Sequence, residues 1–468
     1  MRIRPVLSLL ALGLLTQSAH ALDLAEAYEK ALSSDPTWAA AQQNLSADEE
    51  NLTLSRAYLL PSVDLNGSVT QNDRTLPGTG SSLSYRQNQL GVKATQPLFR
   101  ADAWYGYQQA KAVTSASEAN FADQKQQLIL RVANAYFNVL RAQETLEYSK
   151  AEEAALGRQQ DQSQQRFDVG LIAITDVLEA KAQSDAARAA RISAEAALNT
   201  ARENLIAIIG EDGGKLAPLK TDAPMEKPVP ENPEDWTKLA LEKNPQLMVA
   251  RYNYQSAKAN TNVSRAAYVP NVDVFGQYSD VDIPNSGSNQ LLSFSAGRTT
   301  TFGVEATWNV FGGGRTIAAT RQASYKEVAA QDQVTAAERS AINSTRTAFL
   351  NVSANSYQVD ATKQAVKSNE SALAATQAGY EVGTRNIVDV LLTESNLYAA
   401  KRDYANARYD YVINSLQLKA ASGQLSEVDI RDLNNWLDPN GSITSAPEEP
   451  EPQPAQAAAP AKPAGKKH

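Results

Sequence analysis

Two stretches of the chain alternate hydrophobic and polar residues with the period of two that is typical of β-strands. The alternating apolar positions are Val63, Leu65, Gly67, Val69, Leu90, Val92 and Ala94 in the first stretch and Phe302, Val304, Ala306, Trp308 and Val310 in the second. Loops that contain Pro and Gly interrupt both stretches. This pattern predicts two β-hairpins, at about residues 62–99 and 271–311.

After each hairpin the pattern changes to that of a helix. Between Ala101 and Arg166 there is no Pro, and one helix of that length would reach about 100 Å at 1.5 Å per residue. A Val-Gly pair, with its glycine at Gly170 or Gly383, turns each long segment into a second helix. We therefore predict long helical hairpins at about 101–209 and 315–421. Two neighbouring apolar stripes run along the first of them: Phe121, Leu128, Val132, Ala135, Val139, Ala142 and Leu146 in one, and Ile129, Ala133, Tyr136 and Leu140 in the other. Such stripes suit an antiparallel coiled coil, or a closed ring of helices with neighbours on both sides.

These elements occur twice, because the chain is a tandem repeat with a period of about 210 residues. Four segments recur in the same order: 60–65 as 269–274, 90–95 as 302–307, 134–139 as 347–352, and 167–178 as 380–391. We place the first repeat at 22–212 and the second at 234–421, each starting with a helical segment (about 23–59 and 234–268) that stops before Pro61 or Pro270. A linker, 213–233, joins the repeats, and a further segment, 422–444, follows the second.

The two ends of the sequence have compositions of their own. Residues 1–21 have the pattern of a secretory signal peptide: Arg2 and Arg4, a short apolar core, and Ala-His-Ala as the cleavage site. We expect this segment to be removed. Residues 445–468 consist mainly of Pro, Ala, Glu and Lys, a composition that predicts a disordered tail.

Composition excludes several chemistries. The 468 residues include no Cys and two His, His20 in the predicted leader and His468 at the end. Nucleophilic triads and Cys/His zinc sites therefore lack their residues, and we expect no enzyme activity, metal or cofactor. The balance of 44 Lys plus Arg against 52 Asp plus Glu is acidic, which argues against nucleic acid as a partner.

Alternating strands are usually half-buried strands of a soluble sheet. Here the strand length, the predicted export and the aromatic residues near the strand ends favour strands that cross a membrane. No apolar run after residue 21 is long enough for a transmembrane helix. Four strands are too few to close a barrel, so copies must share it: a dimer would supply eight strands and a trimer twelve, the latter with room for a lumen.

The sequence resembles the TolC family of bacterial outer-membrane exit ducts over about residues 22–440. The most specific stretches are 379–391, which reads GYEVGTRNIVDVL, the later 406–411, NARYDY, and 167–177, FDVGLIAITDV. Because the chain has no Cys to carry a lipid anchor, it is similar to the TolC branch rather than to the acylated drug-efflux branch. The resemblance implies a mixed α and β fold: a homotrimer with a twelve-stranded membrane β-barrel, a long α-helical barrel in the periplasm, and a small equatorial domain.

The resemblance also assigns residues. Tyr380 and Arg385 match a Tyr and an Arg of the family's closed entrance, which pair with residues that match Thr175 and Asp176. A phenol and a guanidinium are well suited to bridging a carboxylate. The turn glycines Gly170 and Gly383 lie at the tips of the two helical hairpins. Asp389 matches the acidic ring of the constriction, but Leu392 replaces a second Asp one turn later, and we therefore expect weaker cation selectivity.

The function that follows is a gated exit duct for multidrug efflux, type I protein secretion or both, located in the outer membrane of a Gram-negative bacterium with a large periplasmic part. Its implied partners are outer-membrane lipid, a periplasmic adaptor and an inner-membrane pump of the RND, ABC or MFS type. Two alternatives combine coiled coils with β-structure: a periplasmic adaptor, and an adhesin-like structural protein.

Overall fold

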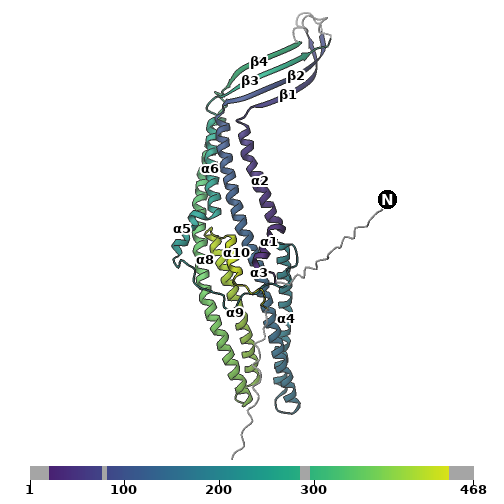
Figure 1. Ribbon diagram of the computed structural model, residues 1–468, viewed down its shortest axis with the longest axis vertical. Helices are drawn as coiled ribbons and strands as arrows, with labels where there is room; N and C mark the ends of the chain where they lie inside the picture. The colour runs from purple at the N-terminus through teal and green to yellow at the C-terminus, as the bar shows by residue number, and fades with distance from the viewer. Residues whose placement is uncertain (1–20, 76–81, 285–295, 442–468) are drawn as a thin grey trace, which may run out of the picture.

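The computed structural model describes residues 21–75, 82–284 and 296–441. The molecule is elongated, with a sheet at one end and the turns of two helical hairpins at the other (Figure 1). The predicted leader, apart from Ala21, the predicted tail, and the loops that join the strands of each hairpin lie outside the described residues.

The sheet has four antiparallel strands in the order of the chain: β1 (Ser62–Thr75), β2 (Ser82–Phe99), β3 (Asn271–Asp282) and β4 (Gly297–Thr307). Each repeat contributes one hairpin, and β2 pairs with β3 to join them. The last strand ends four residues before the predicted position, 311. Asn271 is paired with Thr307, so the next pair would involve Pro270, which has no N–H for the ladder.

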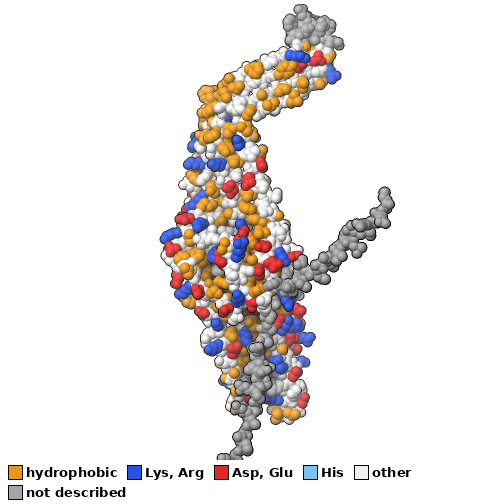
Figure 2. Space-filling view, in the orientation of Figure 1, with side chains coloured by type: hydrophobic (Ala, Val, Ile, Leu, Met, Phe, Trp, Pro, Cys, Tyr) orange, Lys and Arg blue, Asp and Glu red, His pale blue; other side chains and the backbone are white. Residues whose placement is uncertain are grey.

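Many large apolar side chains of the sheet are exposed. Leu65 is 73% exposed and Phe302 is 82% exposed, and Figure 2 shows hydrophobic side chains over the visible face of the sheet. Charged side chains are instead frequent over the helices. Because a soluble sheet buries such a face, the outward apolar surface is the feature that most distinguishes this end of the molecule.

Two very long helices form the body. They are α3 (Ala101–Asp168) and α8 (Arg315–Glu381), of 68 and 67 residues. α4 (Ile174–Ile209) returns beside α3, and α9 (Ile387–Ala421) returns beside α8. At the junction with the sheet, the Arg100 guanidinium donates to both carboxylate oxygens of Asp273, at 3.0 and 2.7 Å, and so ties the start of α3 to β3.

The helical segment at the start of each repeat is broken, whereas one continuous segment was predicted. The first consists of α1 (Leu24–Ser34) and α2 (Pro36–Ala57), and the second of α5 (Pro233–Lys243) and α6 (Pro245–Ala266). Proline at the first position of α2 and α6 prevents continuation of the preceding helix, and the residue before it caps the new one. The Asp35 carboxylate accepts from Thr37 N and Trp38 N, and the Asn244 amide oxygen accepts from Leu247 N.

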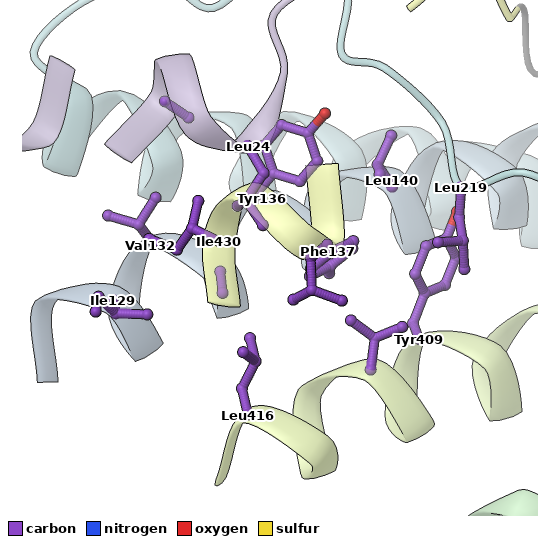
Figure 3. Packing of buried hydrophobic residues seen from close by; sticks show 14 of the residues in the cluster. Leu24, Ile129, Val132, Tyr136, Phe137, Leu140, Leu219, Tyr409, Leu416 and Ile430 are labelled. Atoms are coloured by element: carbon purple, nitrogen blue, oxygen red, sulfur yellow. The ribbon is translucent and has the colours of Figure 1, made fainter. Parts of the chain in front are cut away.

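The main core lies midway along the helices, where α1, α10 (Glu427–Asn434) and the linker surround α3 and α9. Tyr136 and Phe137 of α3 and Tyr409 of α9 are buried there (Figure 3). Both predicted stripes of α3 contribute to this core: Leu128, Val132, Val139 and Leu146 of the first are buried in it, and so are Ile129, Ala133, Tyr136 and Leu140 of the second. The Tyr136 hydroxyl lies 2.9 Å from both Leu22 O and Ala217 O and so joins the start of the described chain to the linker.

None of the helices in the described ranges carries a stretch that is apolar enough to span a bilayer.

Candidate functional site

The candidate site is formed by the turns of the two helical hairpins, here called the first tip (residues 166–176) and the second tip (residues 379–389). Both turns use a glycine in the left-handed region, with φ of 77° at Gly170 and 78° at Gly383. Leu171 N donates to Arg166 O and Thr384 N donates to Gly379 O, so the same backbone bond closes both turns. The repeated Val-Gly motif therefore folds in the same way twice.

The two tips differ in how the returning helix begins. In the second tip, Asn386 caps α9, and its side-chain oxygen accepts from Asp389 N at 2.8 Å. In the first tip the equivalent residue is Ala173, which has no side chain to cap α4. Asp389 and Asp176 both lie in the first helical turn, where a carboxylate interacts favourably with the helix dipole. The returning helix of the second tip thus has a side-chain cap that the first tip lacks.

Asp389, the predicted constriction residue, is half-buried and pairs within its own chain. Its carboxylate lies 3.7 Å from the Arg385 guanidinium, one helical turn away. The side chains of Arg385 and Asp389 are 61% and 37% exposed, so water screens this ion pair strongly. Leu392, on the next turn of α9, is exposed.

Within one chain, the predicted gate residues are not brought together. Among the described contacts, no hydrogen bond or ion pair joins Tyr380 or Arg385 to Thr175 or Asp176. Tyr380 instead lies under Arg166 of α3, with the guanidinium carbon 4.8 Å from the ring centroid. The network of the closed entrance accordingly stays a prediction about the assembled protein.

Arg166 is a tip residue that the sequence analysis missed. It precedes the motif Phe167-Asp168-Val169-Gly170, and the second repeat has Gly379 at the same place. This difference between the repeats could have pointed to Arg166 in the sequence. An arginine in the last turn of α3 is long enough to reach an aromatic ring on α8, as Arg166 reaches Tyr380. The contact joins the two hairpins of a single chain at their tips.

An apolar cluster joins the two hairpins just behind the tips. Its buried members come from three helices: Leu156 of α3, Ala180 and Ala187 of α4, and Ile387, Val390 and Leu391 of α9. The small alanines allow the helices to approach closely. Beyond this cluster, the extreme turns carry exposed apolar side chains, among them Val169, Leu171 and Val382.

A buried polar cluster between α3 and α9 was also missed. The Glu152 carboxylate accepts from Ser395 Oγ at 2.8 Å and from the Arg402 guanidinium at 2.6 Å. Glu394 is buried beside it. In the sequence these residues look like ordinary polar positions of a coiled coil, and only the packing of one repeat on the other buries them.

No group of three or more His, Asp or Glu side chains in the described ranges is arranged to hold a metal ion. What each chain offers at its tips is a set of acidic and basic side chains with one exposed ion pair, Arg385–Asp389, and such groups suit the control of ion passage rather than bond-making.

The sheet exposes apolar side chains, and the paired helical hairpins carry their charged tips to the opposite end of the molecule. This is the arrangement expected of a channel protein in a bacterial outer membrane. The chain belongs to the outer membrane efflux protein family, whose sequence model matches residues 27–211 and 236–424 and so covers both repeats. It is a transport protein of the Gram-negative outer membrane and not an enzyme. Membership also removes the adaptor and the adhesin as alternatives.

Individual relatives agree with this membership. The outer membrane protein TolC of Vibrio cholerae is 36% identical over 440 residues, which is 93% of this chain and 98% of that protein. The alkaline protease secretion protein AprF of Pseudomonas aeruginosa is 29% identical, with 89% and 88% of the two chains covered. The crystal structure of VceC from Vibrio cholerae has the same fold, with a TM-score of 0.75, 18% identity, and coverage of 86% of this chain and 96% of that one. Channel homologues of the TolC family function with efflux or secretion pumps.

Proposed function

We propose that three copies of this chain form an exit duct that carries drugs and secreted proteins from inner-membrane pumps to the outside of the cell. The observation that carries this proposal is the match of both repeats to one efflux family. Similarity to a protease secretion protein adds type I secretion to drug efflux. The proposed pumps are of the RND, ABC or MFS type, each joined to the duct by a periplasmic adaptor.

Features of the single chain support assembly with further copies. β1 and β4 are the edges of the sheet, and an edge strand has unpaired backbone groups that a second sheet can complete. Tyr325, Leu350 and Tyr357 are large apolar residues of α8 that one chain leaves exposed. Pairing of β4 with β1 of the next copy, together with coverage of α8, would satisfy both sets of groups and place the apolar face of the sheet against lipid.

At the other end, the tips are the proposed gate. The intrachain pair of Arg385 and Asp389 contributes about 0.5 kcal/mol, so Arg385 can exchange it for Asp176 and Thr175 at small cost. If each copy contributes about 1 kcal/mol through this network and Tyr380, three copies favour the closed state by about 3 kcal/mol, or roughly a hundredfold. That is strong enough to close the duct and weak enough for a partner to open it.

The exposed apolar residues of the turns are the proposed docking surface for the adaptor. Val169, Leu171 and Val382 lie at the end of the molecule farthest from the sheet. An adaptor that binds these residues contacts the turns themselves. Because separation of the turns would open the entrance, such binding could move the hairpins apart directly.

Single-channel recording in a planar bilayer tests the duct and the gate. We expect small current steps for the unmodified protein and larger steps for Arg385→Ser, because that variant loses the network. Asp389→Ala should reduce the preference for cations. Arg346→Ser is the matched control, since it removes an exposed ion pair with Glu234 near the middle of the molecule and should leave the current unchanged.

A well-folded protein that forms no channel would refute the duct. Channels in which Arg385→Ser and Arg346→Ser behave alike would keep the duct but refute the gate. Equal permeability to cations and anions in the unmodified protein would exclude Asp389 from the constriction.

A further inference from the structure

The two hairpins of one chain are held together by a polar contact deep between α3 and α9. Glu152 of α3 is at its centre, with a side chain only 8% exposed, and Arg402 and Ser395 of α9 both donate to it. A buried carboxylate that receives two such bonds fixes the position of both helices, because separating them leaves a charge without partners. This contact lies on the sheet side of the apolar cluster formed with Leu156 and Leu391.

Glu394 is buried in the same interface but is poorly satisfied. It is 7% exposed, and its Oε2 atom has no hydrogen-bond partner among the described residues. From α3 it faces Arg158 and Glu152, and from its own helix it faces Tyr398. Nearby, α4 contributes Ala180 and Ala187 to the apolar cluster, and the Glu370 carboxylate of α8 pairs with Lys401 of α9. An unpartnered carboxylate oxygen near a second carboxylate calls for a functional explanation.

Burial is the main influence on Glu394 and raises its pKa above 4.5, with Arg158 opposing this shift and Glu152 adding to it. If the hairpins separate, water reaches the carboxyl group and its pKa falls back toward 4.5. The packed arrangement therefore binds the proton more tightly than the separated one. It follows that protonation of Glu394 favours packing of the hairpins. Packing begins to weaken as the pH rises above about 4.5 and continues to weaken until the pH has passed the higher pKa of Glu394 in the packed state.

We propose that Glu152, Arg158, Glu394, Ser395 and Arg402 form a second lock of the entrance, the α3–α9 lock, which loosens when Glu394 loses its proton. The lock rests on the proposed function, because its purpose is to hold the tips of a gated duct. Unlike the tip network, it lies inside each chain and needs no other copy. The duct would therefore have one lock that responds to assembly and another that responds to the acidity of the periplasm.

The packing of the hairpins can be measured without any channel current. The chain has no cysteine, so Ala180→Cys introduces a single thiol at a site of α4 that is 0% exposed and packed in the apolar cluster. Its rate of labelling by a soluble maleimide reports how often the hairpins separate. Ala133→Cys, buried at 1% in the main core, is the control for general unfolding.

The decisive comparison is Glu394→Gln in the Ala180→Cys background, from about pH 5 to about pH 8. Dividing the labelling rate of the protein that keeps Glu394 by the rate of the Glu394→Gln variant at each pH cancels the titration of the thiol. We expect this ratio to rise with pH by about threefold or more, since it changes tenfold for each unit by which the pKa differs between packed and separated hairpins. A flat ratio would overturn the role of Glu394.

Two further variants complete the test. Asp123→Asn is the matched control. Asp123 is another carboxyl group of α3 whose pKa is raised by burial, but it faces Gln246 of α6, away from the tips. The labelling rate of the Ala180→Cys protein divided by that of its Asp123→Asn variant should therefore not change with pH. Glu152→Gln should speed labelling at every pH because it weakens the bond to Arg402, and unchanged labelling would refute the lock. Labelling requires only the folded protein, so a failed lock and a failed duct give different results.

Discussion

Two glycines with almost the same backbone conformation should respond very differently to the same substitution. Gly383, at the second tip, has φ of 78°, and Gly423, just after α9, has φ of 73°. A Cβ atom at Gly383 would have nothing within 4 Å, whereas one at Gly423 would lie 2.3 Å from Lys243 O and 2.7 Å from Asn244 N. We predict that Gly423→Ala destabilises the protein much more than Gly383→Ala does.

The expected sizes follow from two contributions. An L-residue in the left-handed region costs about 1–2 kcal/mol, and the lower entropy of the unfolded chain returns about 0.4–1 kcal/mol of this. Gly383→Ala should therefore cost about 1 kcal/mol. At Gly423 the contact with Lys243 must lengthen by about 1 Å, and because both sides are backbone, this strain adds about 1–3 kcal/mol or more.

Guanidinium unfolding followed by far-ultraviolet circular dichroism measures this difference. We expect the midpoint for Gly383→Ala to stay near that of the unmodified protein and the midpoint for Gly423→Ala to fall clearly below it, with an unchanged slope. Equal shifts for the two variants would show that the close approach of the α9 end to the α5–α6 junction is not maintained in solution.

Three further predictions concern the helices. Burial raises the pKa of Glu144 above 4.5, so the folded protein binds this proton more tightly than the unfolded chain and stability should fall as the pH rises. Glu144→Gln can still accept the hydrogen bond from Tyr409 and should remove this fall, as measured by denaturation midpoints from about pH 4.5 to about pH 8. Asn386→Ala removes the cap of α9 and should cost about 1 kcal/mol, with hydrogen exchange faster in the second tip only; faster exchange in both tips would contradict a local effect. The Arg131 guanidinium lies 2.5 Å from the buried Asp35 carboxylate, and Arg131→Gln leaves that carboxylate without its cation. Arg131→Gln should therefore lower the melting temperature more than Arg346→Ser does, because Arg346 belongs to an exposed ion pair.

Much of the fold could be predicted because its elements are long and strongly patterned. Alternation at Val63, Leu65 and their successors identified the strands, and the absence of Pro between Ala101 and Arg166 identified a helix that extends to Asp168. The mixed α and β fold is thereby confirmed. The breaks before Pro36 and Pro245 were missed although Asp-Pro and Asn-Pro are local signals of a new helix, because the helical pattern continues on both sides.

The site was less predictable because its contacts join distant parts of the chain. Arg385 and Asp389 are one turn apart, and their pairing could have been read from the sequence. The contact of Arg166 with Tyr380 and the burial of Glu394 depend on how one repeat packs on the other, which no local pattern encodes. The roles of Thr175, Asp176, Tyr380 and Arg385 in the gate stay predictions, since they concern contacts in the assembly.

The order of strands in the sheet has a genetic consequence. With β1 and β4 at its two edges, each chain offers two different joining surfaces, and the proposed ring would close only when every β4 pairs with a β1. A chain with a damaged β4 and an intact β1 still enters a ring but leaves it open. If the ring has the three copies proposed above, a cell that makes normal and damaged chains in equal amounts would form only about one ring in eight without a damaged chain. Alleles that damage a single edge should therefore be dominant, whereas alleles that prevent folding should be recessive.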